Sequence, residues 1–216
     1  MKDKSKILSE IRREYQLQIL DETHISPDPL VQLDSWLKEA IDSELYEPTA
    51  MVLSTASKTG KPSSRVVLLK GMVSNGLAFF TNYESKKGKE IAENPLASIN
   101  FFWPELERQV RIEGAIEKIS QSESTLYFHS RPRGSQLGAL ASPQSSVIEN
   151  RVTLETKLKE LEIKFQEKEI PKPDNWGGYI LKPDYFEFWQ GRPNRLHDRI
   201  VYEYKNSSWE VKRLAP

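Results

Sequence analysis

Hydrophobic residues recur every three or four positions in several stretches of the chain, and this spacing predicts amphipathic helices. Helices are expected over residues 7–19, 30–41, 85–93, 122–130, 135–140 and 152–165. The first is the loosest, with its apolar stripe on Ile7, Leu8, Ile11, Tyr15 and Ile19. A turn at residues 26–29, Ser-Pro-Asp-Pro, separates it from the second helix.

Other stretches are rich in β-branched and aromatic residues and are separated by Gly-containing turns, the pattern of antiparallel hairpins. Strands are expected over residues 51–55, 64–70, 77–81, 97–103, 108–119, 178–181 leading to 185–190, 199–204 and 209–214. Residues 108–119 alternate most clearly, with Val110, Ile112, Gly114 and Ile116 on one face. Strand hairpins with inserted helices predict an α+β protein built on an antiparallel barrel.

The chain of 216 residues carries 31 Lys+Arg and 31 Asp+Glu, so its formal net charge is zero. This balance argues against binding of nucleic acid or of an acidic membrane by bulk charge, but it permits a local basic pocket. There is no cysteine, which excludes disulfides and thiolate chemistry and fits a cytoplasmic location. No apolar run approaches the roughly 18 residues of a membrane span, and no secretory signal follows the charged N-terminus.

Common catalytic motifs are missing from the sequence. The three histidines lie far apart, so no metal site is predicted. No Gly-x-Gly-x-x-Gly or Gly-x-Ser-x-Gly motif occurs, and Gly88-Lys89 lacks the rest of a phosphate-binding P-loop.

The first candidate cluster combines residues 65–70 with Ser85, Lys86 and Lys87. Cations near a helix start at Ser85, together with backbone N–H groups, suit a phosphate. Strand alternation puts Arg65 and Lys70 on opposite faces unless the strand ends between them. The alternative is that these cations are simply solvated at strand ends, and the cluster alone favours that alternative.

The second cluster spans residues 127–136. Tyr127 and Arg131 are four positions apart, so one helix face can present a phenol and a guanidinium together. Ser135 starts the next expected helix, either as a site residue or as an N-cap. A solvated Arg-Pro-Arg-Gly turn remains the alternative.

The third cluster spans residues 187–199. Arg195, His197 and Arg199 alternate, so an extended segment projects all three to one side. Two guanidiniums beside an imidazole are costly unless a polar or anionic ligand shares the space. The alternative is a solvated edge strand with partners such as Glu187 or Asp198, but this cluster favours a function. Gln109 and the loop residues Gln144 and Ser145 are further candidate donors.

With these motifs the sequence closely resembles the pyridoxine (pyridoxamine) 5′-phosphate oxidase family. The resemblance rests on Glu187-Phe-Trp-Gln-Gly191, on Arg195-Leu-His-Asp-Arg199, and on motifs beginning at Arg65, Phe80, Glu107, Tyr127, Trp176 and Arg213, in the family's order. It covers residues 25–216 as one oxidase domain and leaves residues 1–24 as a variable, helical N-terminal segment.

The resemblance implies an FMN-binding split β-barrel and a homodimer with active sites at the subunit interface. By motif, FMN would contact Arg65, Val66, Val67, Leu68, Leu69, Lys70, Phe80, Thr81, Lys86, Lys87, Gln109, Gln144, Ser145, Trp189 and Arg199. The substrate would contact Lys70, Tyr127, Arg131, Ser135, Arg195 and His197, the last two being the catalytic pair. Family members often have Ser-Arg-Lys where this chain has Ser85-Lys86-Lys87, which keeps the charge but loses a bidentate group and predicts modestly weaker binding of the FMN phosphate.

The expected activity is oxidation of pyridoxamine or pyridoxine 5′-phosphate to pyridoxal 5′-phosphate, with hydride transfer to FMN and reoxidation by O₂ to hydrogen peroxide. The alternative is a non-catalytic carrier or sensor of flavin or pyridoxal phosphate on the same barrel. A flavin reductase with a nicotinamide donor has no motif in its support.

Overall fold

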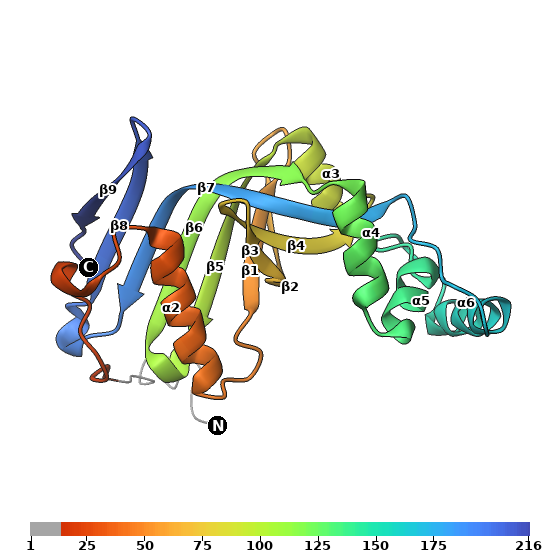
Figure 1. The fold of residues 1–216 in the computed structure, drawn as a ribbon, viewed down its shortest axis with the longest axis horizontal. Helices are drawn as coiled ribbons and strands as arrows, with labels where there is room; N and C mark the ends of the chain where they lie inside the picture. Colours follow the sequence, from red (N-terminus) through yellow and green to blue (C-terminus); the bar gives the residue numbers. More distant parts are fainter. Residues whose placement is uncertain (1–13) are drawn as a thin grey trace, which may run out of the picture. The chain divides into compact units, whose positions relative to one another are not determined.

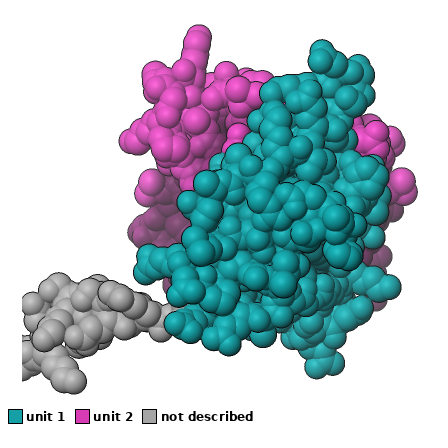
Figure 2. Space-filling view, turned by 90° about the vertical axis from the view of Figure 1, so that its left-hand side faces the viewer, with its two compact units in different colours: residues 1–48, 100–112, 185–216 teal, residues 49–99, 113–184 magenta. Residues whose placement is uncertain are grey.

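The computed structural model describes residues 14–216, which divide into two compact units. Of the described residues, unit 1 comprises residues 14–48, 100–112 and 185–216, and unit 2 comprises residues 49–99 and 113–184 (Figure 2). Three strands run through both units: β5 (Leu96–Trp103), β6 (Arg108–Lys118) and β7 (Trp176–Gln190). The expected single domain over residues 25–216 stays a prediction.

Unit 2 holds a curled antiparallel sheet with helices beside it (Figure 1). Its further strands are β1 (Ala50–Ala56), β2 (Pro62–Leu68), β3 (Gly71–Val73) and β4 (Gly76–Asn82), in the sheet order β2-β1-β5-β6-β7-β4-β3. Its helices are α3 (Lys86–Glu93), α4 (Gln121–Ser130), α5 (Arg133–Ala141) and α6 (Arg151–Lys164). Side chains from α4, α5, α6 and the start of β7 form one apolar cluster, which includes Phe128, Leu161 and Trp176.

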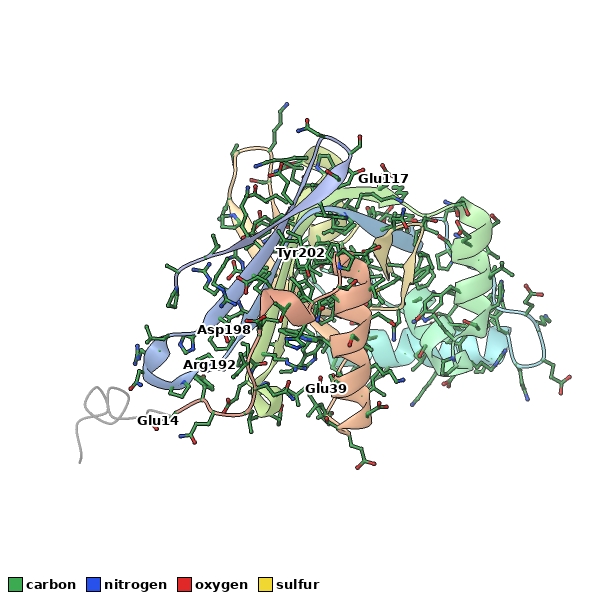
Figure 3. The ribbon with its side chains drawn as sticks, turned by 60° about the vertical axis from the view of Figure 1, so that its left-hand side comes forward. Glu14, Glu39, Glu117, Arg192, Asp198 and Tyr202 are labelled. Atoms are coloured by element: carbon green, nitrogen blue, oxygen red, sulfur yellow. The ribbon has the colours of Figure 1, made fainter. Side chains whose placement is uncertain are left out.

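Unit 1 packs a helix and a strand ribbon around aromatic side chains. It contains the 3-10 turns η1 (Glu22–His24), η2 (Pro104–Leu106) and η3 (Pro193–Arg195), the helix α2 (Pro29–Asp42), and the strands β8 (Asp198–Lys205) and β9 (Ser208–Arg213). The Phe188 ring meets Trp36 edge-on at 5.2 Å and Tyr202 at 5.6 Å between centroids. The buried Tyr202 hydroxyl (Figure 3) donates to the Ser26 carbonyl at 2.7 Å.

The α+β class and the antiparallel pairing are confirmed. Every expected strand and five of the six expected helices are present to within a few residues. The short strand β3 is absent from the sequence-based expectation, and residues 178–190 belong to one continuous strand, β7. The alternation on β6 is confirmed, since Val110, Ile112, Gly114 and Ile116 are all buried.

The expected helix over residues 7–19 is wrong where the structure describes it, because residues 14–20 are irregular. The N–H groups of Gln16 and Leu17 donate to the Glu107 carboxylate at 2.8 and 3.1 Å, and that of Leu20 donates to Asp198 at 3.1 Å. These long-range bonds replace the local ones of a helix. Residues 7–13 lie outside the described residues.

Among residues 14–216, no helix is long and apolar enough to cross a membrane.

Gly114 on β6 is required by a close backbone approach. A Cβ there would lie 2.0 Å from the Lys182 carbonyl oxygen, a backbone atom without freedom to rotate away. We expect Gly114→Ala to lower the free energy of unfolding by about 1–3 kcal/mol, the usual range for overpacking, measured by urea denaturation. Gly134→Ala is the control, because a Cβ at Gly134 would meet no heavy atom within 4 Å. Equal stability of the two variants would contradict this account.

Candidate functional site

A cavity of about 690 Å³ opens in unit 2. Its lining includes many of the residues expected to bind cofactor or substrate: Arg65, Val66, Val67, Leu68, Lys70, Phe80, Thr81, Lys87, Tyr127, Arg131, Ser135 and Gln144. Four cationic side chains therefore gather around one cavity of a chain whose net charge is zero.

Other expected site residues lie elsewhere. Leu69, Lys86 and Ser145 belong to unit 2 but do not line this cavity. Leu69 is buried and its N–H donates to the Thr49 carbonyl, whereas Lys86 is exposed. The expected residues in unit 1 are Gln109, Trp189, Arg195, His197 and Arg199.

Arg65 and Lys70 reach the same cavity because the strand that carries Arg65 stops between them. β2 ends at Leu68, and the Lys70 N–H bonds to the Ala78 carbonyl at 2.8 Å instead of continuing the β1–β2 ladder. This is the strand-end case that the sequence left open. Because the strand ends before Lys70, the alternation of side chains along a strand does not force Arg65 and Lys70 onto opposite faces.

Arg65 is held in place by polar groups behind the cavity. Its Nη1 donates to Thr55 Oγ1 at 2.6 Å, and its Nη2 lies 3.2 Å from Glu90 Oε2. Burial alone would raise the pKa of Glu90, but hydrogen bonds from Ser63, Thr55 and Arg65 outweigh it and leave the pKa below its ordinary value. Arg65 is thus a charge-compensated, oriented guanidinium.

Lys87 is buried beside the cavity without a carboxylate partner among the described residues. Ser85 caps α3 by accepting from the Gly88 N–H at 3.3 Å, which places Lys87 in the first helical turn. The ammonium donates to Thr81 Oγ1 at 3.1 Å and to Gln144 Oε1 at 3.4 Å. Burial, and to a lesser extent Arg65, lowers the pKa of Lys87.

Lys86 points elsewhere. Its side chain is 64% exposed, and its ammonium lies 3.9 Å from Glu90 Oε1.

A second cationic group lies where α4 ends. Arg131 is the C-cap residue, with extended backbone, and its guanidinium lies 4.7 Å from the Trp176 ring centroid. Its Nη1 is buried with no hydrogen-bond partner among the described residues. Burial lowers the pKa of Arg131, opposed by the nearby Tyr127 hydroxyl. A buried donor without a partner is costly, and an anionic oxygen in the cavity would satisfy it.

An aromatic wall accompanies Arg131. The Phe80 ring stacks on Tyr127 at 3.8 Å and on Trp176 at 5.6 Å between centroids. Burial raises the pKa of the Tyr127 hydroxyl, so it remains a neutral donor at ordinary pH. Ser135 is the third residue of α5 and not its N-cap, because the helix already begins at Arg133 after Pro132.

The third cluster is a turn followed by a strand, so the expected single extended face is wrong. Asn194 and Arg195 have left-handed backbones, with φ of 55° and 61°. Pro193 starts the η3 turn, and an ion pair between Arg192 and Asp198 at 3.7 Å spans it (Figure 3). Arg195 is exposed at this turn.

His197 lies against Trp189, with 4.6 Å between ring centroids. Its Nδ1 accepts the Arg192 backbone N–H at 3.1 Å. Burial and Arg195 lower the pKa of His197, while Asp198 opposes the shift. The ring is therefore neutral near pH 7, and its remaining proton sits on Nε2.

Several residues that line the cavity are not among the expected site residues: Asn82, Gly138, Ala139, Ser142 and Trp176. Trp176 opens one of the motifs behind the family resemblance, which is a usable signal. Gly138, Ala139 and Ser142 come from α5 and its C-cap, where the sequence carries no chemical pattern.

Two family models match the chain. Residues 37–165 match the model described as pyridoxamine 5′-phosphate oxidase. Residues 176–216 match the pyridoxine 5′-phosphate oxidase C-terminal dimerisation region.

Similar proteins span nearly the whole chain. Proteins named pyridoxine/pyridoxamine 5′-phosphate oxidase are 51% identical in Cyanothece sp. (strain PCC 7425 / ATCC 29141) and 52% identical in Burkholderia mallei (strain SAVP1). These alignments cover 97% of this chain in both cases, and 98% and 99% of the relatives.

Two solved structures resemble the fold. PhzG from Burkholderia lata 383, in complex with tetrahydrophenazine-1-carboxylic acid, has a TM-score of 0.88 at 30% identity, covering 93% of this chain and 99% of its own. A pyridoxamine 5′-phosphate oxidase-related, FMN-binding protein from Nostoc punctiforme PCC 73102 has a TM-score of 0.70 at 20% identity, covering 88% and 99%. The latter likeness concerns the fold alone.

The curled antiparallel sheet and the likeness to these two structures place the fold in the split-barrel class. Within this class, the chain belongs to the pyridoxamine 5′-phosphate oxidase family.

The buried Lys87 makes a testable contribution to stability. Its pKa is lowered in the folded protein, so below that pKa the full cost of burying the ammonium is present. The cost is relieved as pH rises from the lowered pKa towards the ordinary lysine value of 10.5. We expect Lys87→Met to stabilise the flavin-free protein at pH 7, by about 0.5–2 kcal/mol, and the gain to shrink towards pH 10. Denaturant unfolding at both pH values measures it.

Lys89→Met is the matched control, since Lys89 is an exposed lysine of the same helix. A destabilised Lys87→Met, or an equal gain in the control, would contradict the assigned cost of burial.

Proposed function

We propose that this protein oxidises pyridoxamine 5′-phosphate and pyridoxine 5′-phosphate to pyridoxal 5′-phosphate with bound FMN. The observation that carries the proposal is the pair of separate cationic groups on one cavity. Lys87 with Thr81 and Gln144 forms one group, and Arg131 beside Tyr127 forms the other. A phosphorylated cofactor and a phosphorylated substrate need two such groups.

The first group suits the FMN phosphate. Lys87 has no carboxylate partner within the described part of the chain, Arg65 is oriented from behind, and Ser85 starts a helix whose N–H groups favour anions. The exposed Lys86 faces Glu90. We therefore expect that having Lys86 where family members often have Arg costs little affinity for FMN. When bound, FMN supplies the hydride acceptor, and O₂ restores its oxidised state with formation of hydrogen peroxide.

The second group suits the substrate phosphate. The partnerless Arg131 Nη1, the neutral Tyr127 hydroxyl, and the exposed Lys70 and Ser135 line the same cavity. A phosphate held there would fix the orientation of the pyridine ring, which is a large part of catalysis by positioning.

Arg195 and His197 would act on the reacting side of the substrate. A guanidinium stays protonated in proteins and is therefore a poor base, so Arg195 would orient the substrate and stabilise charge. The Nδ1 of His197 is engaged by the Arg192 N–H. The proton on Nε2 therefore favours a donor and positioning role for His197 over that of a proton acceptor.

The dimerisation region over residues 176–216 indicates a homodimer. We propose that the protein is a homodimer with its active sites at the subunit interface, and that the expected site residues of unit 1, Gln109, Trp189, Arg195, His197 and Arg199, contribute to these sites. A cytoplasmic location belongs to the same proposal and fits a chain without cysteine.

A non-catalytic flavin or pyridoxal phosphate carrier is the alternative. It is disfavoured because a carrier has no need for Arg195, His197, Tyr127 and Arg131 together. The ligand in the PhzG complex is a phenazine carboxylic acid. A guanidinium such as that of Arg131 binds carboxylates and phosphates alike, so the choice of a phosphorylated substrate rests on the more similar relatives, which carry the phosphate-oxidase name.

Anaerobic reduction tests the activity. We expect the purified protein to carry FMN, and pyridoxine 5′-phosphate added without oxygen to bleach the visible absorbance of the flavin, on the order of seconds for typical turnover. Oxygen should then restore the colour with one hydrogen peroxide per turnover. If the flavin stays oxidised with both phosphorylated substrates, the oxidase proposal is wrong and the carrier hypothesis is favoured. Rapid bleaching of the flavin by NADH would instead indicate a reductase.

Substitutions distinguish the residues expected to act on the substrate from those expected to hold FMN. We expect Arg195→Ala and His197→Ala to lower kcat/KM by about 10²-fold while the protein stays yellow, and Arg65→Ala to weaken FMN retention instead. Steady-state kinetics with added FMN and a flavin-to-protein ratio provide the two measurements. Normal turnover of Arg195→Ala after FMN is resupplied would overturn the division of roles.

A further inference from the structure

Glu187 is a buried carboxylate beside two residues expected to contact FMN, and the roles assigned so far do not include it. It lies on β7, 2% exposed. Trp189 and Arg199 are directly paired across β7 and β8, while Glu187 is paired with Val201. Because side chains alternate along a strand, Glu187, Trp189 and Arg199 project from one face of the β7–β8 ribbon.

Each oxygen of this carboxylate holds a different arginine. Arg199 Nε donates to Oε1 at 2.8 Å, and Arg111 Nη1 donates to Oε2 at 2.9 Å. The Tyr185 hydroxyl adds a contact to Oε2 at 3.3 Å. One buried negative charge thus orients two guanidinium groups at once.

The arrangement fixes the direction of the Arg199 guanidinium. Its Nε edge is bound to Glu187, and its Nη1 donates to the Ala215 carbonyl at 2.8 Å. Two donors on different nitrogens, tied to strand β7 and to the C-terminal segment, leave the planar group little rotational freedom. The Glu187 and Ala215 bonds use Nε and Nη1, so Nη2 is the nitrogen that Arg199 can offer to an acceptor on the cofactor.

We propose that Glu187 is a positioning residue for the flavin, acting through Arg199. The carboxylate holds Arg199 rigid before the cofactor arrives, so FMN does not have to order a mobile side chain on binding. Glu187 is not a catalytic residue, because its carboxylate is occupied by the two arginines and Tyr185. The inference rests on the proposed function, in which Arg199 contacts FMN.

The test is a double-mutant cycle on FMN affinity, measured by quenching of flavin fluorescence on titration of the flavin-free protein. We expect Glu187→Gln to raise the Kd for FMN about tenfold, the scale of one charge-assisted hydrogen bond, and Arg199→Ala to raise it at least as much. In the Arg199→Ala background, Glu187→Gln should add less than about twofold, since the residue through which it acts is gone. A merely structural role predicts additive losses.

Steady-state kinetics supply a second readout. At saturating FMN, the KM of Glu187→Gln for pyridoxine 5′-phosphate should stay within about twofold of wild type, because the substrate set is untouched. Glu187→Asp keeps the negative charge but shortens the side chain by one methylene, so its Kd for FMN should lie between those of wild type and Glu187→Gln. If Glu187→Gln does not fold, Glu187→Asp replaces it in the cycle.

Glu39→Gln is the matched control. Glu39 pairs with the buried Arg108 at 2.6 Å in the same unit, and its ion pair does not involve Arg199. The substitution should lower stability without changing the Kd for FMN. Additive losses in the cycle, or wild-type affinity in both Glu187 variants, would overturn the positioning role. A wild-type protein that binds no FMN would instead contradict the proposed function.

Discussion

The cavity of unit 2 depends on burying cations that the protein leaves without full compensation. Lys87 is 8% exposed, and hydroxyl and amide oxygens surround its ammonium where a carboxylate would stabilise it better. Arg131 keeps a buried donor without any partner in the described part of the chain. Both arrangements cost folding free energy, since a charge removed from water needs an opposite charge or several hydrogen bonds. An anionic ligand supplies the missing opposite charge. The same burial that lowers the stability of the empty protein therefore raises the affinity of the cavity for an anion.

Packing around the cavity offsets the free-energy cost of burying these cations. The stacked Phe80, Tyr127 and Trp176 rings form one wall, joined to the apolar cluster of α4, α5 and α6. The Arg65–Glu90 pair stabilises the cavity from behind through Thr55 and Ser63. Glu187 plays the corresponding part for Arg199 in unit 1. Arg65 and Arg199 are oriented by their carboxylate partners. Lys87 and Arg131 have no carboxylate partner among the described residues, and they are the cations that we assign to phosphates.

Local patterns in the sequence were sufficient for most of the fold. Hydrophobic periodicity located α2, α6 and the alternating strand β6, because burial on one face leaves its period in the sequence. The same reasoning failed over residues 14–20, where carboxylates distant in sequence, Glu107 and Asp198, bind the backbone N–H groups. It also failed at Arg195, whose left-handed backbone breaks the alternation assumed from Arg195 to Arg199. Over residues 14–20 long-range hydrogen bonds outweighed a weak local preference, whereas at Arg195 a local turn that starts at Pro193 replaced the extended backbone.

The sequence by itself determined the chemical inventory: a neutral chain with local cationic motifs, no thiol, and a motif order that resembles one oxidase family. Only the tertiary structure decided which cations share a cavity and which are compensated. Lys86 and Lys87 are adjacent and identical in type, yet one is exposed beside Glu90 and the other is buried beside Thr81 and Gln144. The physical reason is that solvation and pairing of a charge depend on its three-dimensional surroundings, which residue type and spacing do not specify.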